Sequence, residues 1–249
     1  MTFTFAGLLS VAWRLFRRDR ALITVVASAF IFLPAFAALL LCDPLPPLPP
    51  APRDEIVVRA WMGAVAQWGQ ANALWFVLAD LVATFGAATI ALLLLDPDRV
   101  TVGQALGQAL VRLVAYTMVS VGIAIPVGLG MWLLVLPGLY AQARLSAAIP
   151  AMARHPALRP WAALRLSWKM TRGYDWAITG ALVTLFLVQW IVVSPLLQAD
   201  EALRGGPDGG HVLAVALVDA LIAGLGTFYG VATLLIGVVV YRVRASSGT

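Results

Sequence analysis

Residues 73–95 read ALWFVLADLVATFGAATIALLLL, and Asp80 is the only charged side chain among them. About 20 apolar residues in a helix, rising about 1.5 Å each, match a hydrocarbon core about 30 Å thick. Because backbone N–H and C=O groups cannot stay unpaired in lipid, such a stretch must form a helix. These residues therefore predict a helix that crosses a membrane.

Similar apolar runs occupy most of the chain. They cover residues 21–42, 113–143, 177–198 and 212–241, where Asp219 is the only charged side chain. Of the 249 residues, 61% are hydrophobic and 12% are charged, against roughly a quarter charged in soluble domains. The composition predicts one all-α, polytopic integral membrane domain covering residues 1–249.

The distribution of Lys and Arg predicts the orientation, since cytoplasmic segments retain positive charge during insertion. On one side of the expected spans, only Arg53, Arg59 and Arg204 occur. Both termini are therefore expected on the other side, in the cytoplasm, with an even number of crossings. The residues assigned to the cytoplasmic side are Arg14, Arg17, Arg18, Arg20, Arg99, Arg112, Arg154, Arg159, Arg165, Lys169, Arg172, Arg242 and Arg244.

Six spans satisfy this rule if the long central run folds back on itself. A single helix over residues 113–153 would be about twice as long as the bilayer is thick. The turn is expected at residues 128–130; the alternative is a turn at Pro137 and Gly138, which would leave the fourth span short. The six spans are expected at about residues 21–42, 73–95, 111–128, 131–153, 176–197 and 212–241.

A cleaved signal peptide is the alternative interpretation of the first run. Arg17, Arg18 and Arg20 precede that run, and residues 35–37, Ala-Phe-Ala, resemble a cleavage site. The apolar residues continue to Leu41, however, which favours a retained first helix.

A short amphipathic segment precedes the first, third and fifth spans. In each segment, apolar residues recur at three- and four-residue steps, which is typical of helices that lie along the head-group layer. Residues 12–15 and 23–24 also align with residues 167–170 and 178–179. The recurrence has two explanations of equal weight. One is an internal triplication of an interfacial helix plus a hairpin; the other is that interfacial helices share the same requirements.

Three fragments carry a family resemblance. They are LPGLY at residues 136–140, ARLS at 143–146 and ALRLSWKMTRG at 163–173. They resemble bacterial multi-pass proteins related to the membrane domain found beside some glycerophosphoryl diester phosphodiesterases. The resemblance implies six helices in the bacterial inner membrane and no activity for the membrane part. The phosphodiesterase catalytic domain has no counterpart here, because the chain has no long polar segment and only two histidines.

Four residues in the apolar runs form a predicted polar cluster. An Asp near the bilayer centre costs about 2.5–3.5 kcal/mol, so its carboxylate must face protein or water. Asp80 and Asp219 each share a helix face with small residues, and Gly226 and Gly230 form a GxxxG pattern that favours close helix packing. We expect both acids to point into the bundle and Arg144, on the face of Tyr140, to bridge one or both. The cluster serves either as a structural ion pair or as a polar pathway.

A second predicted site is a basic surface for lipid head groups. It comprises Arg165, Lys169 and Arg172 beside the fifth span, and Arg14 and Arg17 beside the first. The same residues also fit the rule that Lys and Arg mark cytoplasmic segments. The sequence does not distinguish this effect on orientation from binding of lipid head groups. No metal or cofactor is expected, since Cys42 stands alone and His and Cys lack metal-ligand spacing.

The favoured function is a non-catalytic inner-membrane protein. It would engage anionic lipids, other membrane proteins or further copies of itself, and not nucleic acid. The alternative is a small transporter or channel that uses Asp80, Arg144 and Asp219. An enzyme is not expected, because no nucleophile has a base partner at a recognisable spacing.

Overall fold

The computed structural model describes residues 4–43, 45–47, 49–52, 54–96, 100–204 and 212–246, which form helices joined by short connections and contain no strand. Arg53, Arg99 and residues 205–211, between the last two expected spans, lie outside the described residues. Five helical stretches are long and apolar enough to cross a membrane. They are Arg20–Leu41 (α2, η1 and α3), α4 (Glu55–Leu95), α6 (Leu113–Leu133), α10 (Asp175–Arg204) and α11 (Val212–Ser246).

The outer surface of these helices is apolar. Trp132 is 83% exposed and Leu213 is 87% exposed, and many other large apolar side chains face outward. Soluble monomers rarely expose apolar surface on this scale, whereas lipid tails cover it without cost. For the described residues, the prediction of an all-helical fold with several helices long and apolar enough to cross a membrane is therefore confirmed.

The first span is continuous but changes its hydrogen bonding near the middle. It consists of α2 (Arg20–Ala27), a π-helical turn η1 (Ser28–Phe32) and α3 (Leu33–Leu41). Pro34 has no N–H to donate to the carbonyl four residues earlier, so the wider turn before it accommodates the missing bond.

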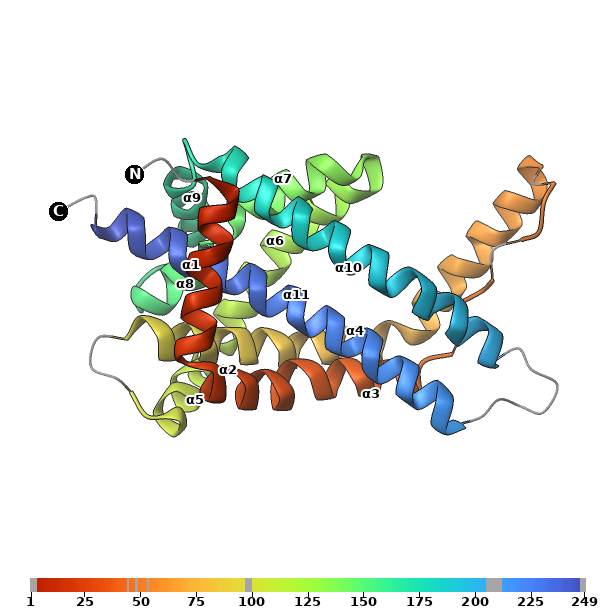
Figure 1. The fold of residues 1–249 in the computed structure, drawn as a ribbon, viewed down its shortest axis with the longest axis horizontal. Coiled ribbons are helices and arrows are strands. Elements are labelled where there is room, and N and C mark those ends of the chain that lie inside the picture. Colours follow the sequence, from red (N-terminus) through yellow and green to blue (C-terminus); the bar gives the residue numbers. More distant parts are fainter. Residues whose placement is uncertain are drawn as a thin grey trace.

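The second span begins 18 residues earlier than expected. Asp54 caps α4 by accepting a hydrogen bond from the N–H of Val57 over 2.8 Å, and the helix then runs without interruption to Leu95. Its early part lies beside the segment that follows α3, because the indole of Trp68 donates to the carbonyl of Asp43 over 2.7 Å. Figure 1 shows this part of α4 extending away from the other helices.

The central run forms the expected hairpin, but its turn is at Leu134. This residue is extended, with φ −162° and ψ 144°, between α6 and α7 (Val135–Leu145). Residues 128–130 lie inside α6, so the turn predicted there is wrong, and Pro137 and Gly138 lie inside α7. A Cβ added to Gly130 would lie 2.6 Å from the backbone nitrogen of Gly138. Both glycines therefore serve the close contact of the two helices rather than the turn.

The expected fourth span over residues 131–153 is wrong as a single helix. After α7 the chain breaks at Ser146 and Ala147 and continues as α8 (Ala148–Arg154). Neither helix is long enough to cross a bilayer alone, since α7 has 11 residues and α8 has seven. The alternative prediction, a short fourth span, is closer to the structure.

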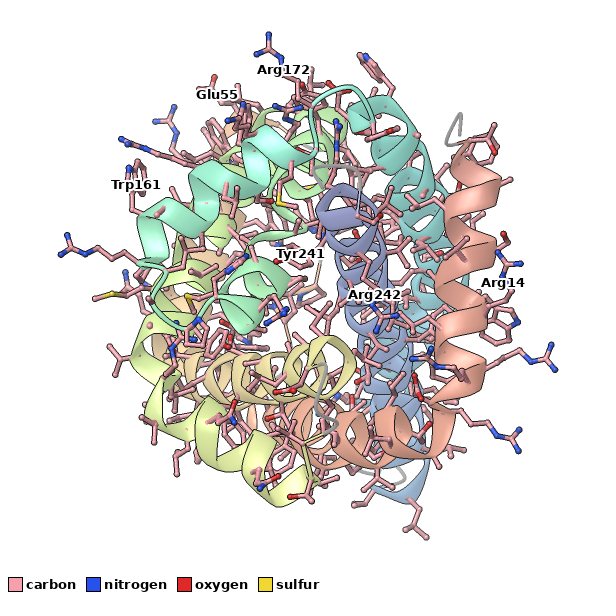
Figure 2. The ribbon with its side chains drawn as sticks, turned by 90° about the vertical axis from the view of Figure 1, so that its left-hand side faces the viewer. Arg14, Glu55, Trp161, Arg172, Tyr241 and Arg242 are labelled. Atoms are coloured by element: carbon pink, nitrogen blue, oxygen red, sulfur yellow. The ribbon has the colours of Figure 1, made fainter. Side chains whose placement is uncertain are left out.

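The three short amphipathic helices are present where the sequence predicts them. They are α1 (Phe5–Arg18), α5 (Val102–Val111) and α9 (Pro160–Met170). Thr101 and Gln104 form a capping box on α5, and Pro160 opens α9. All three lie at one end of the bundle, where α11 also ends (Figure 1), and we name this the short-helix end. Figure 2 looks onto it and shows the three helices at its periphery.

The short helices and hairpins pack in a cyclic order. α5 packs against α4, α9 packs against α6 and α8, and α1 packs against α10 and α11. α5 thus packs on the first hairpin, which ends with α4, and α9 packs on the second, which runs from α6 to α8. α1 packs on the third hairpin, formed by α10 and α11, and this contact closes the ring. The returning helices α4, α8 and α11 contact one another at the centre.

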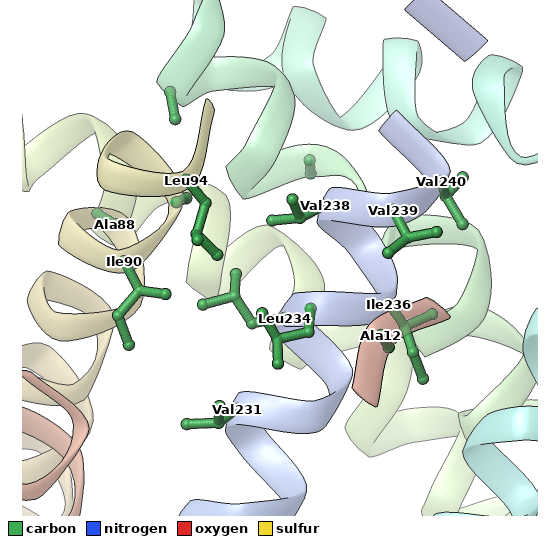
Figure 3. Packing of buried hydrophobic residues seen from close by; sticks show 14 of the residues in the cluster. Ala12, Ala88, Ile90, Leu94, Val231, Leu234, Ile236, Val238, Val239 and Val240 are labelled. Atoms are coloured by element: carbon green, nitrogen blue, oxygen red, sulfur yellow. The ribbon is translucent and has the colours of Figure 1, made fainter. Parts of the chain in front are cut away.

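The hydrophobic core lies mainly in the half of the bundle near the short-helix end. Figure 3 shows Ile90 and Leu94 of α4 beside Leu234 and Val238 of α11 in this core. α11 passes closest to the α7–α8 break at Gly237, where an added Cβ would lie 2.1 Å from the carbonyl oxygen of Ser146. The close packing expected at the GxxxG pattern is wrong, because a Cβ on Gly226 or Gly230 would meet no described atom within 4 Å.

Candidate functional site

Arg144 joins three helices at the short-helix end. Its Nη2 donates to the carbonyl of Trp168 over 2.7 Å, and its guanidinium carbon lies 4.6 Å from the centroid of a Trp168 ring. Its Nη1 lies 3.5 Å from Oδ2 of Asp175, the first residue of α10. Arg144 is 4% exposed, so these contacts rather than water hold its charge. Arg144 therefore fastens α7 to α9 and to the start of α10.

The residues around Arg144 stabilise the break between α7 and α8. The hydroxyl of Ser167 donates to the carbonyl of Arg144 over 2.9 Å and accepts from the N–H of Ala147 over 3.2 Å. These bonds replace helical ones that the break removes. The hydroxyl of Tyr140 lies 3.4 Å from Oδ2 of Asp175, so Tyr140 and Arg144 share this carboxylate.

Asp219 is buried, as expected, but its partner is Arg204. Nη2 of Arg204 lies 2.7 Å from Oδ2 of Asp219, and Nε of Arg204 lies 2.9 Å from Oδ1 of Asp200. The pair joins the end of α10 to the beginning of α11, at the end of the bundle opposite the short helices. It therefore closes the last hairpin.

The predicted cluster of Asp80, Arg144 and Asp219 is wrong. Asp80 is exposed on α4 and makes no hydrogen bond or ion pair with a described residue. Arg144 lies near the short-helix end because α7 is short, whereas Asp219 lies toward the opposite end. The expected inward orientation holds for Asp219 and fails for Asp80. The transporter alternative thus loses the shared site on which it depended.

Replacing Arg204 by Met is expected to lower the free energy of unfolding by about 1–3 kcal/mol, measured by thermal unfolding in mild detergent. The Asp219 side chain is 2% exposed and would lose its cation. The matched control is Arg59→Met, because Arg59 pairs with Glu55 while both remain in solvent. Equal shifts in the two variants would contradict a stabilising role for the buried pair.

A basic cavity of about 980 Å³ opens at the short-helix end. It lies between the end of α8, the face of α9 and the end of α11. Figure 2 shows Tyr241 near the centre of this end and Arg172 at its rim. The hydroxyl of Tyr241 lies 2.8 Å from Nε2 of His155, which ties α11 to the end of α8. The lining residues are Arg154, His155, Leu166, Lys169, Met170, Arg172, Tyr241, Arg244 and Ala245.

The structure divides the five predicted head-group residues among three places. Lys169 and Arg172 line the cavity. Arg165 is exposed, with its guanidinium 5.6 Å from the centroid of a Trp161 ring, and Arg14 and Arg17 are exposed on α1. All five belong to the short-helix end, but they do not form one surface.

Sequence reasoning missed several residues that complete these sites. Arg154, His155, Tyr241 and Arg244 join the cavity from helices that are distant in sequence. Asp175 was also missed as the partner of Arg144, although an acid in the first turn of a helix was a usable signal. No group of three His, Cys, Asp or Glu side chains suited to a metal ion occurs in the part of the chain that is described.

Comparisons of this chain with protein-family models, with curated proteins and with solved structures find no match.

Proposed function

We propose that the chain is a non-catalytic protein of the bacterial inner membrane that holds anionic lipids at its short-helix end. The observation that carries the proposal is the unequal charge of the two ends. Among the described residues, the short-helix end has thirteen Lys and Arg side chains, the buried Arg144 included, against Asp19, Asp96 and Asp175. The opposite end has Arg59 and Arg204 against six acids, Asp43, Asp54, Glu55, Asp200, Glu201 and Asp219.

The charge difference supports our proposal that the short-helix end, where α1 lies and α11 ends, faces the cytoplasm. This orientation requires an even number of crossings. α7 and α8 together return the chain to the short-helix end, which supports a broken crossing beside the five long helices and so a total of six. The anionic lipids of the inner leaflet then face the basic end, where each cation near the surface contributes about 1 kcal/mol to lipid attraction.

An internal triplication accounts for the cyclic packing. The starts of α1 and α9 are 155 residues apart, and so are the starts of α2 and α10. Each repeated unit consists of a short helix and the hairpin that follows it. In each unit, the third and sixth residues after the start of the hairpin's first span are buried. These residues are Ile23 and Val26 after Arg20, Tyr116 and Val119 after Leu113, and Ile178 and Ala181 after Asp175.

Neutralising the exposed cations Arg14, Arg17 and Arg165 to Gln is expected to lower lipid retention severalfold. The measurement is native mass spectrometry of the protein extracted in mild detergent with added phosphatidylglycerol. The reason is that each substitution removes a cation from the surface that faces the anionic leaflet. Arg59→Gln, at the opposite end, is the control and should retain the lipid.

Two results would overturn the proposal. One is unchanged phosphatidylglycerol retention in the triple variant. The other is solute uptake into proteoliposomes that disappears in Asp219→Asn, which would favour a transporter instead.

A further inference from the structure

We propose that the basic cavity binds a phosphomonoester, an inference that rests on the proposed function because it names the ligand of the same end of the molecule. Four cationic side chains from α8, α11, α9 and the turn after α9 converge on one opening: Arg154, Lys169, Arg172 and Arg244. None of the described residues that line it is acidic. A single phosphate group with two negative charges matches this surplus of cations better than a zwitterionic head group does.

The cavity also has the size and mixed lining of a ligand site. Its volume of about 980 Å³ is at the upper end of the range of roughly 300–1,000 Å³ found for small-molecule clefts. Leu166 and Met170 of α9 supply apolar wall on the side of the membrane-associated helix. The bond between Tyr241 and His155 holds the opposite walls together. A phosphate can therefore contact cations while the apolar part of the same ligand lies against the apolar wall.

The cations of the cavity divide into structural and ligand-facing ones. Arg244 donates from Nε to the carbonyl of Met170 over 2.9 Å and from Nη2 to the carbonyl of Arg172, so it caps the end of α9. Arg154, Lys169 and Arg172 have exposed side chains at the rim. These three are the residues that we assign to the ligand.

The enrichment of Lys and Arg on the cytoplasmic side does not by itself explain these charges. A second cavity in the same ring of helices provides the comparison. This cavity, of about 550 Å³, lies between the end of α4, the face of α5 and Pro156 after α8. In the cyclic order this position is equivalent to that of the basic cavity. It carries one cation and one acid, Arg112 and Asp96, with the amides Gln104 and Gln108. Equivalent positions in the fold thus differ in charge, which points to a ligand at only one of them.

The test compares two triple variants that remove the same number of cations from the same end. The cavity variant is Arg154→Gln, Lys169→Gln and Arg172→Gln, and the control is Arg14→Gln, Arg17→Gln and Arg165→Gln. The full chain is placed in phosphatidylcholine nanodiscs, either with phosphatidic acid added to the bilayer or with inorganic phosphate and glycerol 3-phosphate added in solution. Native mass spectrometry counts bound lipid, and calorimetry measures the soluble phosphates.

We expect one saturable phosphomonoester site per chain, weakened by more than about tenfold in the cavity variant and by less than about threefold in the control. Binding of phosphatidic acid alone identifies a lipid source, and competition by the soluble phosphates identifies a free one. Melting temperatures of all three proteins report whether folding is preserved, and Arg172→Gln alone replaces the triple variant if it is not.

Two outcomes would overturn the inference: no saturable binding, or equal losses in the two triple variants. Either result leaves the proposed function standing if phosphatidylglycerol retention still falls in both variants. If retention falls in neither, the proposed function fails as well.

Discussion

Replacing Arg144 by Ala is expected to lower the free energy of unfolding by about 3 kcal/mol or more, which a large fall in the melting temperature in mild detergent would record. The substitution removes the donor to the carbonyl of Trp168 and leaves Asp175 without its cation. Breaking a buried ion pair from one side is costly, since the remaining charge loses its partner and does not regain full hydration. The stacking of the guanidinium on Trp168 is lost as well.

The design includes two comparison variants. Arg165→Ala removes another Arg from the same end, but its side chain is exposed and lies over the Trp161 ring, so we expect a change within about 0.5 kcal/mol. Arg144→Lys keeps the charge but not the fork of donors that reaches both Trp168 and Asp175, so an intermediate loss is expected. Melting of Arg144→Ala at the wild-type temperature would show that the three helices are held by packing alone.

The positions of the long helices follow from the sequence because their cause is local. Residues 73–95 are apolar over more than the thickness of a bilayer, and residues of this kind have no other stable conformation in lipid. The short helices are equally predictable, since Thr101 and Pro160 are start signals and the apolar spacing is that of a helix. The early start of α4 at Glu55 was missed because residues 55–72 are less apolar than the run that follows.

The break between α7 and α8 has one local cause, which was missed, and others that are distant in sequence. Pro150 is the local signal, because it has no N–H to donate to the carbonyl of Ser146 four residues earlier. The bonds that compensate for the break come from Ser167, about 20 residues further on, and the space for it is set by Gly237 of α11. The same break places Arg144 near Asp175, which is why the predicted partners Asp80 and Asp219 were wrong.

The basic cavity could not be predicted from the sequence for a related reason. Taken singly, Arg154, Lys169 and Arg244 each satisfy the rule for cytoplasmic ends of spans, so none of them signals a site. Only the packing of α8, α9 and α11 brings them to one opening. The charge of the end was therefore predictable, and the grouping of the charges was not.

Replacing Gly237 by Leu is expected to disrupt the bundle more than any other single exchange in α11. Even a Cβ at this position would lie 2.1 Å from the carbonyl oxygen of Ser146, and a backbone atom cannot move aside as a flexible side chain can. Forcing extra carbons into a packed core costs about 1–3 kcal/mol for small additions, and a Leu side chain adds four carbons here. We expect little folded protein after extraction, measured by size-exclusion chromatography in detergent, and a lower melting temperature even for Gly237→Ala.

Gly230→Leu is the matched control for this prediction. Gly230 lies two turns earlier on the same helix, and an added Cβ there meets no described atom within 4 Å. Since Leu also favours helix more than Gly does, the control is expected to fold as well as the wild type or better. If Gly230→Leu disrupted the protein while Gly237→Leu did not, the small-residue pattern at Gly226 and Gly230 would be the true contact. The central position of α11 against the α7–α8 break would then be wrong.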